Sequence, residues 1–397
     1  MQIVNTTILL LVLASMLLLS YLLHFPLDRL RMPNLLAPLL VGLAFQALPY
    51  QEAVSTAAAS ELFHELGQLG VMLLLFIVGL QIETAELRKL SGHIVALTFL
   101  NLGISSILGF LVLTLFGYSA VISALVATAL ATVAETTIAP ILDELGVVKT
   151  RIATLILGPG IIDDVVEIGI ASLASIIVGK RAATNPSTLA TGLATLLMLT
   201  LVFHKAFIPF LCKKDRECKS VQLFLLMSGT VSIFTAVSLA FDLGVLLGAI
   251  VAGIVFQRFL KESRNNESGL SILRPVAYGL LGPVFFFEIG YGVSFQSLAS
   301  SLSLTGLLLA ANFVGKFLAV FAAGRITHLN WREIVVIGLG LSTKFSMGII
   351  PIQIFYSAKL IDQNVFSSFV AVSAITTLVI PFTLAWTMNK WKQHLIL

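Results

Sequence analysis

Residues 157–167 read Leu157-Gly-Pro-Gly-Ile-Ile-Asp163-Asp164-Val-Val-Glu167, so three carboxylates lie in the middle of an apolar run. The run covers residues 151–179, which is long enough for a helix to cross roughly 30 Å of hydrocarbon. The glycines and the proline allow this helix to bend, and adjacent carboxylates point about 100° apart around its axis. A charge at the centre of such a helix costs at least about 2.5–3.5 kcal/mol, so the acids predict pairing or a hydrated cavity.

The rest of the chain is equally apolar. Of its 397 residues, 58% are hydrophobic and 11% are charged, and the mean hydropathy is +1.01. This is too much apolar surface for one soluble core. We therefore predict an all-α polytopic membrane protein with no soluble regulatory domain. Thirteen spans are predicted, near residues 3–24, 34–50, 66–82, 92–117, 119–142, 151–179, 188–211, 219–241, 243–260, 271–293, 301–324, 331–357 and 363–388.

The loop charges predict an orientation. Nineteen lysines and arginines fall in loops on one predicted side, and only Lys180, Arg181 and Lys359 fall on the other. The basic side is expected to be cytoplasmic, which places the N-terminus outside and the C-terminus in the cytoplasm. The net charge of +4 is explained by this bias and needs no nucleic-acid partner. We expect an integral protein of a bacterial inner membrane.

The sequence also resembles itself at an offset of 211 residues. Leu36–Gln46 aligns with Leu247–Gln257, and in the same register Asn101 aligns with Asn312. We predict two six-helix repeats, residues 1–180 and 219–397, joined by a connecting helix in residues 181–218. Because the first half would start outside and the second inside, the repeats are inverted, an architecture common in secondary transporters. A channel or membrane enzyme with accidental similarity is the alternative.

Seven charged residues are predicted inside spans, away from the ends: Glu135, Asp163, Asp164, Glu167, Glu288, Lys316 and Lys344. A carboxylate can bind either a proton or a metal ion such as Na⁺, so Asp163 and Asp164 are the candidate ion- and proton-binding residues. Lys316 lies too deep to reach either interface, and we expect it to pair with Asp163. Asn312 lies one turn away on the same face. A lysine satisfied by backbone carbonyls is the other interpretation.

Polar breaks at related positions predict two interrupted helices that cross in mid-membrane. They are Ala131-Thr132-Val-Ala-Glu135-Thr136-Thr137-Ile-Ala-Pro140 and Gly338-Leu-Gly340-Leu-Ser342-Thr343-Lys344-Phe-Ser346-Met-Gly348. Glu135 near half-helix N-ends and Lys344 near C-ends would neutralise the helix dipoles, and the two side chains could also interact directly. The Thr136 and Thr137 hydroxyls could complete the oxygen shell of a cation. Glu167 and Glu288 are candidate accessory residues.

Several motifs resemble the cation:proton antiporter-2 family, which includes bacterial sodium/proton antiporters and the membrane part of potassium efflux systems. They are Leu145-Gly146, Leu155-Ile-Leu-Gly158-Pro-Gly-Ile-Ile-Asp163-Asp164, Val284-Phe-Phe-Phe-Glu288-Ile-Gly290 and Val314-Gly315-Lys316. The resemblance implies a homodimer with an elevator-like moving bundle. It also implies that Asp164 is the exchange carboxylate, that Asp163 pairs with Lys316, and that transport is electrogenic.

Exchange of Na⁺ or Li⁺ for protons is the leading hypothesis. A K⁺/H⁺ antiporter is the runner-up, and Glu135, Glu288 and Lys344 depart from the family pattern in ways that leave cation choice and stoichiometry open. A cation-coupled symporter of a small organic solute, or a channel or sensor, is a further alternative. No nucleophile–base pair, phosphate loop or metal-ligand spacing predicts an enzyme or a cofactor. The expected partners are monovalent cations, protons, membrane lipid and a second copy of the chain.

Overall fold

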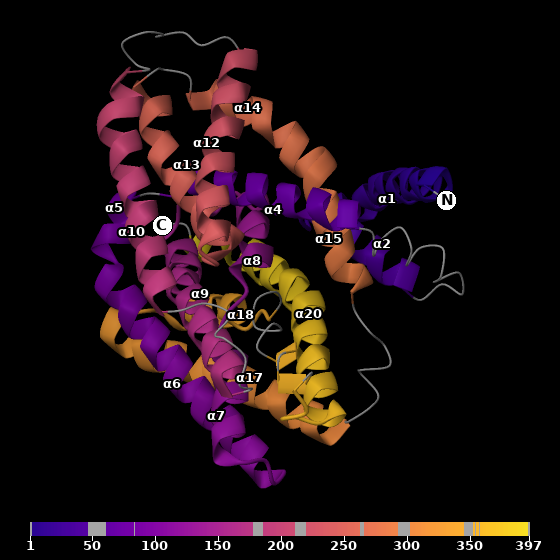
Figure 1. The fold of residues 1–397 in the computed structure, drawn as a ribbon, viewed down its shortest axis with the longest axis vertical. Coiled ribbons are helices and arrows are strands. Elements are labelled where there is room, and N and C mark those ends of the chain that lie inside the picture. The colour runs from indigo at the N-terminus through magenta and orange to yellow at the C-terminus, as the bar shows by residue number, and fades with distance from the viewer. Residues whose placement is uncertain are drawn as a thin grey trace. The chain divides into compact units, whose positions relative to one another are not determined.

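The computed structural model describes residues 2–46, 61–82, 84–177, 186–210, 220–262, 266–292, 302–344, 352–353, 355–356 and 358–395 (Figure 1). Within these ranges every regular element is a helix, and no strand occurs. The prediction of an all-α protein is confirmed. Nine helices in the described part are long and apolar enough to cross a membrane, and two shorter apolar helices, Leu36–Gln46 and Gly244–Leu260, accompany them. Each of the thirteen predicted spans coincides, at least in part, with helix.

The chain forms two compact units, and each unit takes one segment from either half of the sequence. Unit 1 comprises Met1–Ile82 and Ala190–Val293, and unit 2 comprises Glu83–Leu189 and Ser294–Leu397. Ile82 and Val293, the last residues of the two segments of unit 1, are separated by the 211-residue offset found in the sequence.

Unit 1 is built of apolar helices. Its elements are α1 (Gln2–Arg29), α2 (Leu36–Gln46), α4 (Glu61–Gln81), most of α10 (Pro186–Val202), the π-helical turn η1 (Phe203–Phe207), α12 (Ser220–Ala240), α13 (Gly244–Glu262), α14 (Asn266–Val276), the π-helical turn η2 (Ala277–Leu281) and α15 (Gly282–Tyr291). The predicted span 271–293 is thus one helical column with a local π-turn just after Pro275, a usual site for such a distortion.

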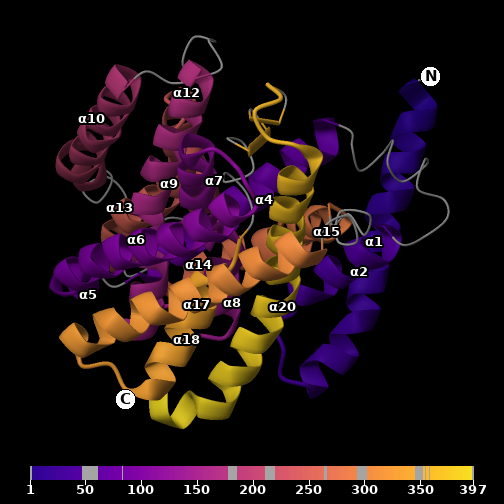
Figure 2. The same cartoon turned by 90° about the horizontal axis from the view of Figure 1, so that it is seen from below.

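Unit 2 contains the helices on which most of the candidate site residues lie. Its elements are α5 (Thr84–Lys89), α6 (Ser91–Leu115), α7 (Ala120–Ala131), α8 (Glu135–Glu144), α9 (Arg151–Ile177), α17 (Leu302–Thr327), α18 (Trp331–Leu341) and α20 (Gln363–Leu395). Helices α6 and α17 pack along each other, and α9 contacts α6, α7, α8 and α18. Figure 2 gives a second view of these helices.

Glycines allow close main-chain approach in unit 1, and the contacts come in exchanged pairs. A methyl group at Gly42 on α2 would overlap the Phe287 carbonyl oxygen on α15, and one at Gly253 on α13 would overlap the Phe76 carbonyl oxygen on α4. Gly253 is Gly42 plus 211, and Phe287 is Phe76 plus 211. The same contact is therefore made twice with the partners exchanged.

A second pair of contacts behaves in the same way. A methyl group at Gly79 would overlap the Ile250 carbonyl oxygen, and one at Gly290 would overlap the Leu39 carbonyl oxygen. Both residues of the second contact again differ from those of the first by the same offset. Two equivalent halves would make such contacts, although the predicted boundaries of the repeats, at residues 180 and 219, stay a prediction.

Candidate ion-binding site

The site forms around two interruptions of helical structure in unit 2. Helix α7 ends at Ala131 and α8 begins at Glu135, so Thr132, Val133 and Ala134 lie outside both helices. Helix α18 ends at Leu341 and is followed by the non-helical residues Ser342, Thr343 and Lys344. The Ala134 amide donates a hydrogen bond to the Thr343 carbonyl oxygen, at 3.1 Å between N and O. The two interruptions therefore meet main chain to main chain.

Two buried asparagines bind the carbonyl groups at the C-terminal ends of the interrupted helices. The Asn101 side-chain amide on α6 donates to the Ala131 carbonyl oxygen at 3.2 Å. The Asn312 side-chain amide on α17 donates to the Ser342 carbonyl oxygen at 3.0 Å. A helix leaves its last carbonyl groups without intrahelical partners, so these donors satisfy groups that would otherwise be costly to bury. Both residues of the second contact are again the first pair plus 211.

Two buried lysines also reach the C-terminal end of α7. The Lys316 ammonium group on α17 donates to the Ala131 carbonyl oxygen and, at 3.4 Å, to that of Thr132. The Lys344 ammonium group donates to the Ala129 carbonyl oxygen and, at 3.0 Å, to the Thr132 hydroxyl. The relative exposure of Lys316 is 0% and that of Lys344 is 3%. The partial negative charge of a helix C-terminus favours cations there.

Asp163 on α9 ties the acidic helix to this crossing. Its side chain is fully buried, and its Oδ2 atom accepts a hydrogen bond from the Val133 amide at 3.0 Å. Both lysine ammonium groups, of Lys316 and Lys344, lie close enough for their charges to act on the carboxylate. Its other oxygen, Oδ1, has no hydrogen-bond donor among the described residues. Asp163 can thus present one free oxygen while the main chain holds the other.

Glu135 occupies the first position of α8, where the partial positive charge of a helix N-terminus favours an acid. Its side chain is buried, with 1% relative exposure. The carboxyl group lies directly over Gly160 of α9, where a methyl group would overlap it. Glycine at position 160 therefore provides the space in which the Glu135 carboxyl group lies.

The hydroxyl groups of Thr136 and Thr137 follow in the first turn of α8. Thr137 is fully buried, and neither hydroxyl oxygen has a hydrogen-bond partner among the residues that the structure describes. Oxygen atoms without a donor are suited to a hard cation, which takes carboxylate, carbonyl and hydroxyl ligands. Their role as ligands stays a prediction.

Asp164 and Glu167 lie on the helical backbone of α9, but their side chains are outside the part of the chain that the structure describes. With Asp163 placed at the crossing, helical geometry turns the next side chain by about 100°. The predicted role of Asp164 as the exchange carboxylate and that of Glu167 as an accessory acid stay predictions.

Glu288 lies in unit 1, on α15, and not in the unit that contains the crossing. Its Oε1 atom contacts Nδ1 of His64, on α4, at 2.6 Å. A methyl group at Gly67, one turn further along α4, would lie 2.7 Å from the other Glu288 carboxylate oxygen. His64 was not among the predicted site residues, because nothing in its local sequence indicates a partner 224 positions away.

Sequence analysis also missed two threonines of α20 that hold the second interruption. The Thr376 hydroxyl accepts a hydrogen bond from the Lys344 amide at 3.2 Å, and the Thr377 hydroxyl donates to the Lys344 carbonyl oxygen at 2.6 Å. Both side chains are fully buried. The signal was present, since adjacent hydroxyl residues in the middle of an apolar span require hydrogen-bond partners.

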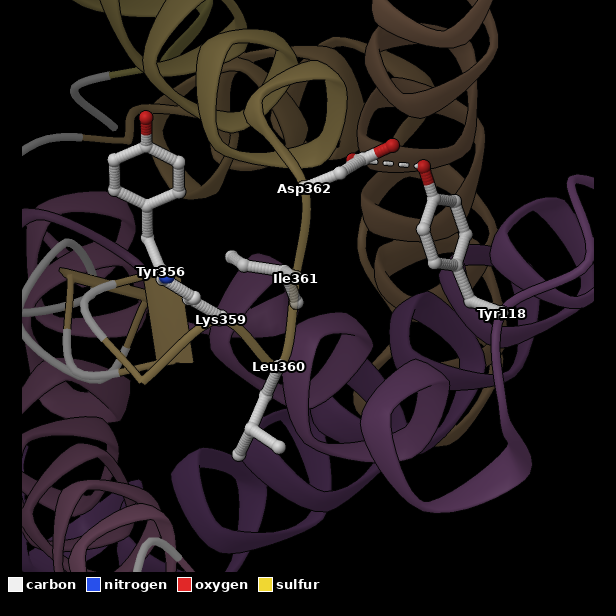
Figure 3. A pocket seen from close by; sticks show the side chains of 6 residues that line it. All are labelled: Tyr118, Tyr356, Lys359, Leu360, Ile361 and Asp362. Carbon is white, nitrogen blue, oxygen red and sulfur yellow. Dashed lines mark hydrogen bonds between the residues drawn. The ribbon is translucent and has the colours of Figure 1, made fainter.

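A cavity of about 670 Å³ lies elsewhere in unit 2, lined by Tyr118, Tyr356, Lys359, Leu360, Ile361 and Asp362 (Figure 3). The Tyr118 hydroxyl and Oδ1 of Asp362 are 2.9 Å apart. Burial, followed by the hydrogen bond to Asp362 and its charge, raises the pKa of Tyr118 to about 12. The phenol therefore remains a hydrogen-bond donor at any ordinary pH.

Residues 13–390 match the family described as sodium/hydrogen exchanger, transmembrane. The chain is 24% identical over 374 residues to a Na⁺/H⁺ antiporter of Enterococcus hirae, covering 91% of this chain and 93% of the relative. It is 22% identical over 363 residues to the Na⁺/H⁺-K⁺ antiporter GerN of Bacillus cereus, covering 91% of each. The sodium proton antiporter MjNhaP1 from Methanocaldococcus jannaschii, solved at pH 8, has the same fold, with a TM-score of 0.67, 16% identity and 99% coverage of both chains.

Proposed function

Because the chain belongs to the transmembrane sodium/hydrogen exchanger family, we propose that it exchanges Na⁺ or Li⁺ for protons by alternating access. The observation that carries the proposal is the buried Asp163 carboxylate, held by the Val133 amide at the crossing and facing two buried ammonium groups. An intramembrane acid of this kind marks an ion or proton pathway.

In the proposed cycle the carboxylates of α9 bind either the metal ion or protons, because the same oxygen atoms cannot hold both. Asp164 is the exchange carboxylate, which binds the cation directly. Asp163 contributes its free oxygen and pairs with Lys316 when the cation leaves, so that neither buried charge is left without a partner. The hydroxyl groups of Thr136 and Thr137 complete the oxygen shell.

The charges at the crossing support a single exchange site. The residues related by the 211-residue offset to Lys316 and Asp163 are Ser105 and Ala374, which carry no charge. The first half thus supplies the acid and the second half the base. Glu135 and Lys344 stabilise the opposite ends of the interrupted helices, so the crossing persists while the cation site fills and empties.

The Asp163-Asp164 pair favours the cation:proton antiporter-2 group, in which such a pair accompanies electrogenic exchange. If more protons than sodium ions move per cycle, the membrane potential contributes about 2.3 kcal/mol per net charge and 100 mV. We further propose a homodimer in a bacterial inner membrane, with a cytoplasmic C-terminus, in which unit 2 is the moving part.

Exchange of K⁺ for protons is the second candidate, because GerN, whose name includes both Na⁺ and K⁺, is similar over 91% of this chain. The transport site on α9 would be the same, and selectivity would depend on the oxygen atoms supplied by α8.

Dequenching of a pH-sensitive dye in everted vesicles tests the proposal. NaCl, LiCl, KCl or choline chloride is added to vesicles that contain the wild type or Asp164→Asn. Dequenching by Na⁺ or Li⁺ that is lost in the variant is the expected result. A response to K⁺ alone would support the second candidate. The absence of a response to any cation, with the protein present in the membrane, would refute antiport.

A further inference from the structure

All three tryptophans of the chain lie at one end of unit 2, together with three cationic side chains. This Trp–basic patch comprises Arg325 on α17, Trp331 and Arg332 on α18, and Trp386, Lys390 and Trp391 on α20. The three helices contact one another, and Figure 2 shows them side by side. The Trp331 and Trp391 rings meet edge to face, with centroids 4.8 Å apart, which joins the start of α18 to the end of α20.

The cationic groups of the patch lie over aromatic rings. The Lys390 ammonium group is 4.8 Å from the centroid of the Trp386 ring, and the Arg332 guanidinium group is 5.5 Å from that of Trp331. Arg325 lies 4.9 Å from the Phe321 ring in the same way. These contacts orient the cations but leave their charges uncompensated.

No carboxylate neutralises these charges within the described part of the chain. No ion pair of the described residues includes Arg325, Arg332 or Lys390, whereas Lys89, for example, pairs with Glu86. Glu333, the acid beside Arg332, instead accepts a hydrogen bond from the main-chain N–H group of Asn330 at 2.8 Å. The Nε atom of Arg332 is buried without a hydrogen-bond partner among the described residues.

The patch also lies where the spans end. One apolar span runs from Leu302 to Arg325 and another from Gln363 to Trp391. Trp331 and Trp386 are nevertheless large apolar residues with 60% and 55% relative exposure. Tryptophan is enriched at the membrane–water interface, where its ring contacts acyl chains and its N–H group reaches the headgroups.

From this juxtaposition we infer that the Trp–basic patch binds the headgroup of an anionic phospholipid. A lipid supplies what the patch lacks, namely a phosphate charge for the cations and acyl chains for the exposed indole rings. A free anion would leave the rings uncovered. A second copy of the chain docked two-fold on the same surface would bring identical cations together.

Quenching of tryptophan fluorescence by brominated lipid tests this inference directly, because every tryptophan belongs to the patch. The full-length protein is reconstituted into vesicles of phosphatidylglycerol and phosphatidylcholine in which either one or the other lipid is brominated. We expect brominated phosphatidylglycerol to quench more strongly at equal mole fraction. The affinity of the patch for phosphatidylglycerol relative to phosphatidylcholine should fall roughly fivefold for each charge removed. This preference should disappear in Arg325→Gln/Arg332→Gln/Lys390→Gln.

The matched control removes three other exposed cations that are predicted on the same side of the membrane, in Arg29→Gln/Arg88→Gln/Lys149→Gln. It should retain the preference. Equal quenching of the wild type by the two lipids would overturn the inference, as would an equal loss in the control. Abolition of the preference by added inorganic phosphate would point to a free anion, and a change of oligomeric state in the patch variant would point to a protein interface. Either result would overturn the lipid assignment.

Discussion

Gly160→Ala tests how tightly the Glu135 carboxyl group is held at the crossing. A methyl group at position 160 would overlap the terminal atoms of the Glu135 side chain, which is buried with 1% relative exposure. Because the carboxyl group is buried and would have to move away from the added methyl group, the substitution should cost about 1–3 kcal/mol in overpacking. The higher helix propensity of alanine returns about 0.5–1 kcal/mol. We expect a net loss of up to about 2 kcal/mol.

A double-mutant cycle with Glu135→Ala isolates the contact. The shorter side chain removes the overlap, so Gly160→Ala should stabilise the Glu135→Ala background by about 0.5–1 kcal/mol. The cycle should therefore give a coupling free energy of about 1–3 kcal/mol. Gly103→Ala is the control, because a methyl group there, on exposed α6 surface, meets no atom within 4 Å.

The assay is the apparent melting temperature in detergent, measured for all variants at one heating rate. Differences of a few degrees are expected between Gly160→Ala and Gly103→Ala. The reasoning is refuted if Gly160→Ala is as harmless as Gly103→Ala, or if its effect is the same with and without the Glu135 side chain.

Three other substitutions test the rest of the geometry. Asp163→Asn removes the charge that faces two buried ammonium groups, so dye dequenching should be abolished and stability should fall by about 3–5 kcal/mol; wild-type flux would contradict the assignment. Thr376→Val leaves the Lys344 amide without its hydroxyl acceptor and should cost about 1–3 kcal/mol in a thermal melt, whereas Thr376→Ser should be close to the wild type. Tyr118→Phe should lower the melting temperature at pH 8–9. The folded-state pKa of Tyr118 is raised from 10.0 to about 12, so the stabilisation from its hydrogen bond to Asp362 is fully present below pH 10 and is lost from pH 10 to 12. A difference in melting temperature between the wild type and Tyr118→Phe that stays constant up to pH 12 would argue against this.

The interrupted helices could be predicted because local composition determines them. Thr132 and Ser342 are buried polar residues that each follow an apolar helical run, and their hydroxyl groups donate to carbonyl oxygens of the preceding turn. The position of Lys344 near a helix C-terminus also followed from the charge of its side chain. Its partners, the Ala129 carbonyl and the Thr132 hydroxyl, did not follow, because they depend on how two distant segments pack.

Partners far apart in the sequence remained beyond prediction for the same reason. The contact between His64 and Glu288 brings together α4 and α15, and neither residue has a local pattern that indicates the other. The division into two units was also missed, because the internal similarity shows which segments are equivalent but not which of them pack together. The role of Asp164 as the exchange carboxylate, on which the exchange hypothesis depends most, stays a prediction.

The exchanged glycine contacts have a consequence for how such a chain could arise. In these contacts a residue i of one half meets a residue j of the other, and the counterpart of j meets the counterpart of i. Such a surface is isologous, which is the arrangement of a two-fold symmetric homodimer. If the halves descend from one shorter gene, its product could already pair with a copy of itself inserted in the opposite orientation. A single glycine codon would then have satisfied both close approaches at once. Fusion of the two copies released each position to vary alone, so a charge could arise in one half without arising at its counterpart, as with Asp163 in the first half and Lys316 in the second.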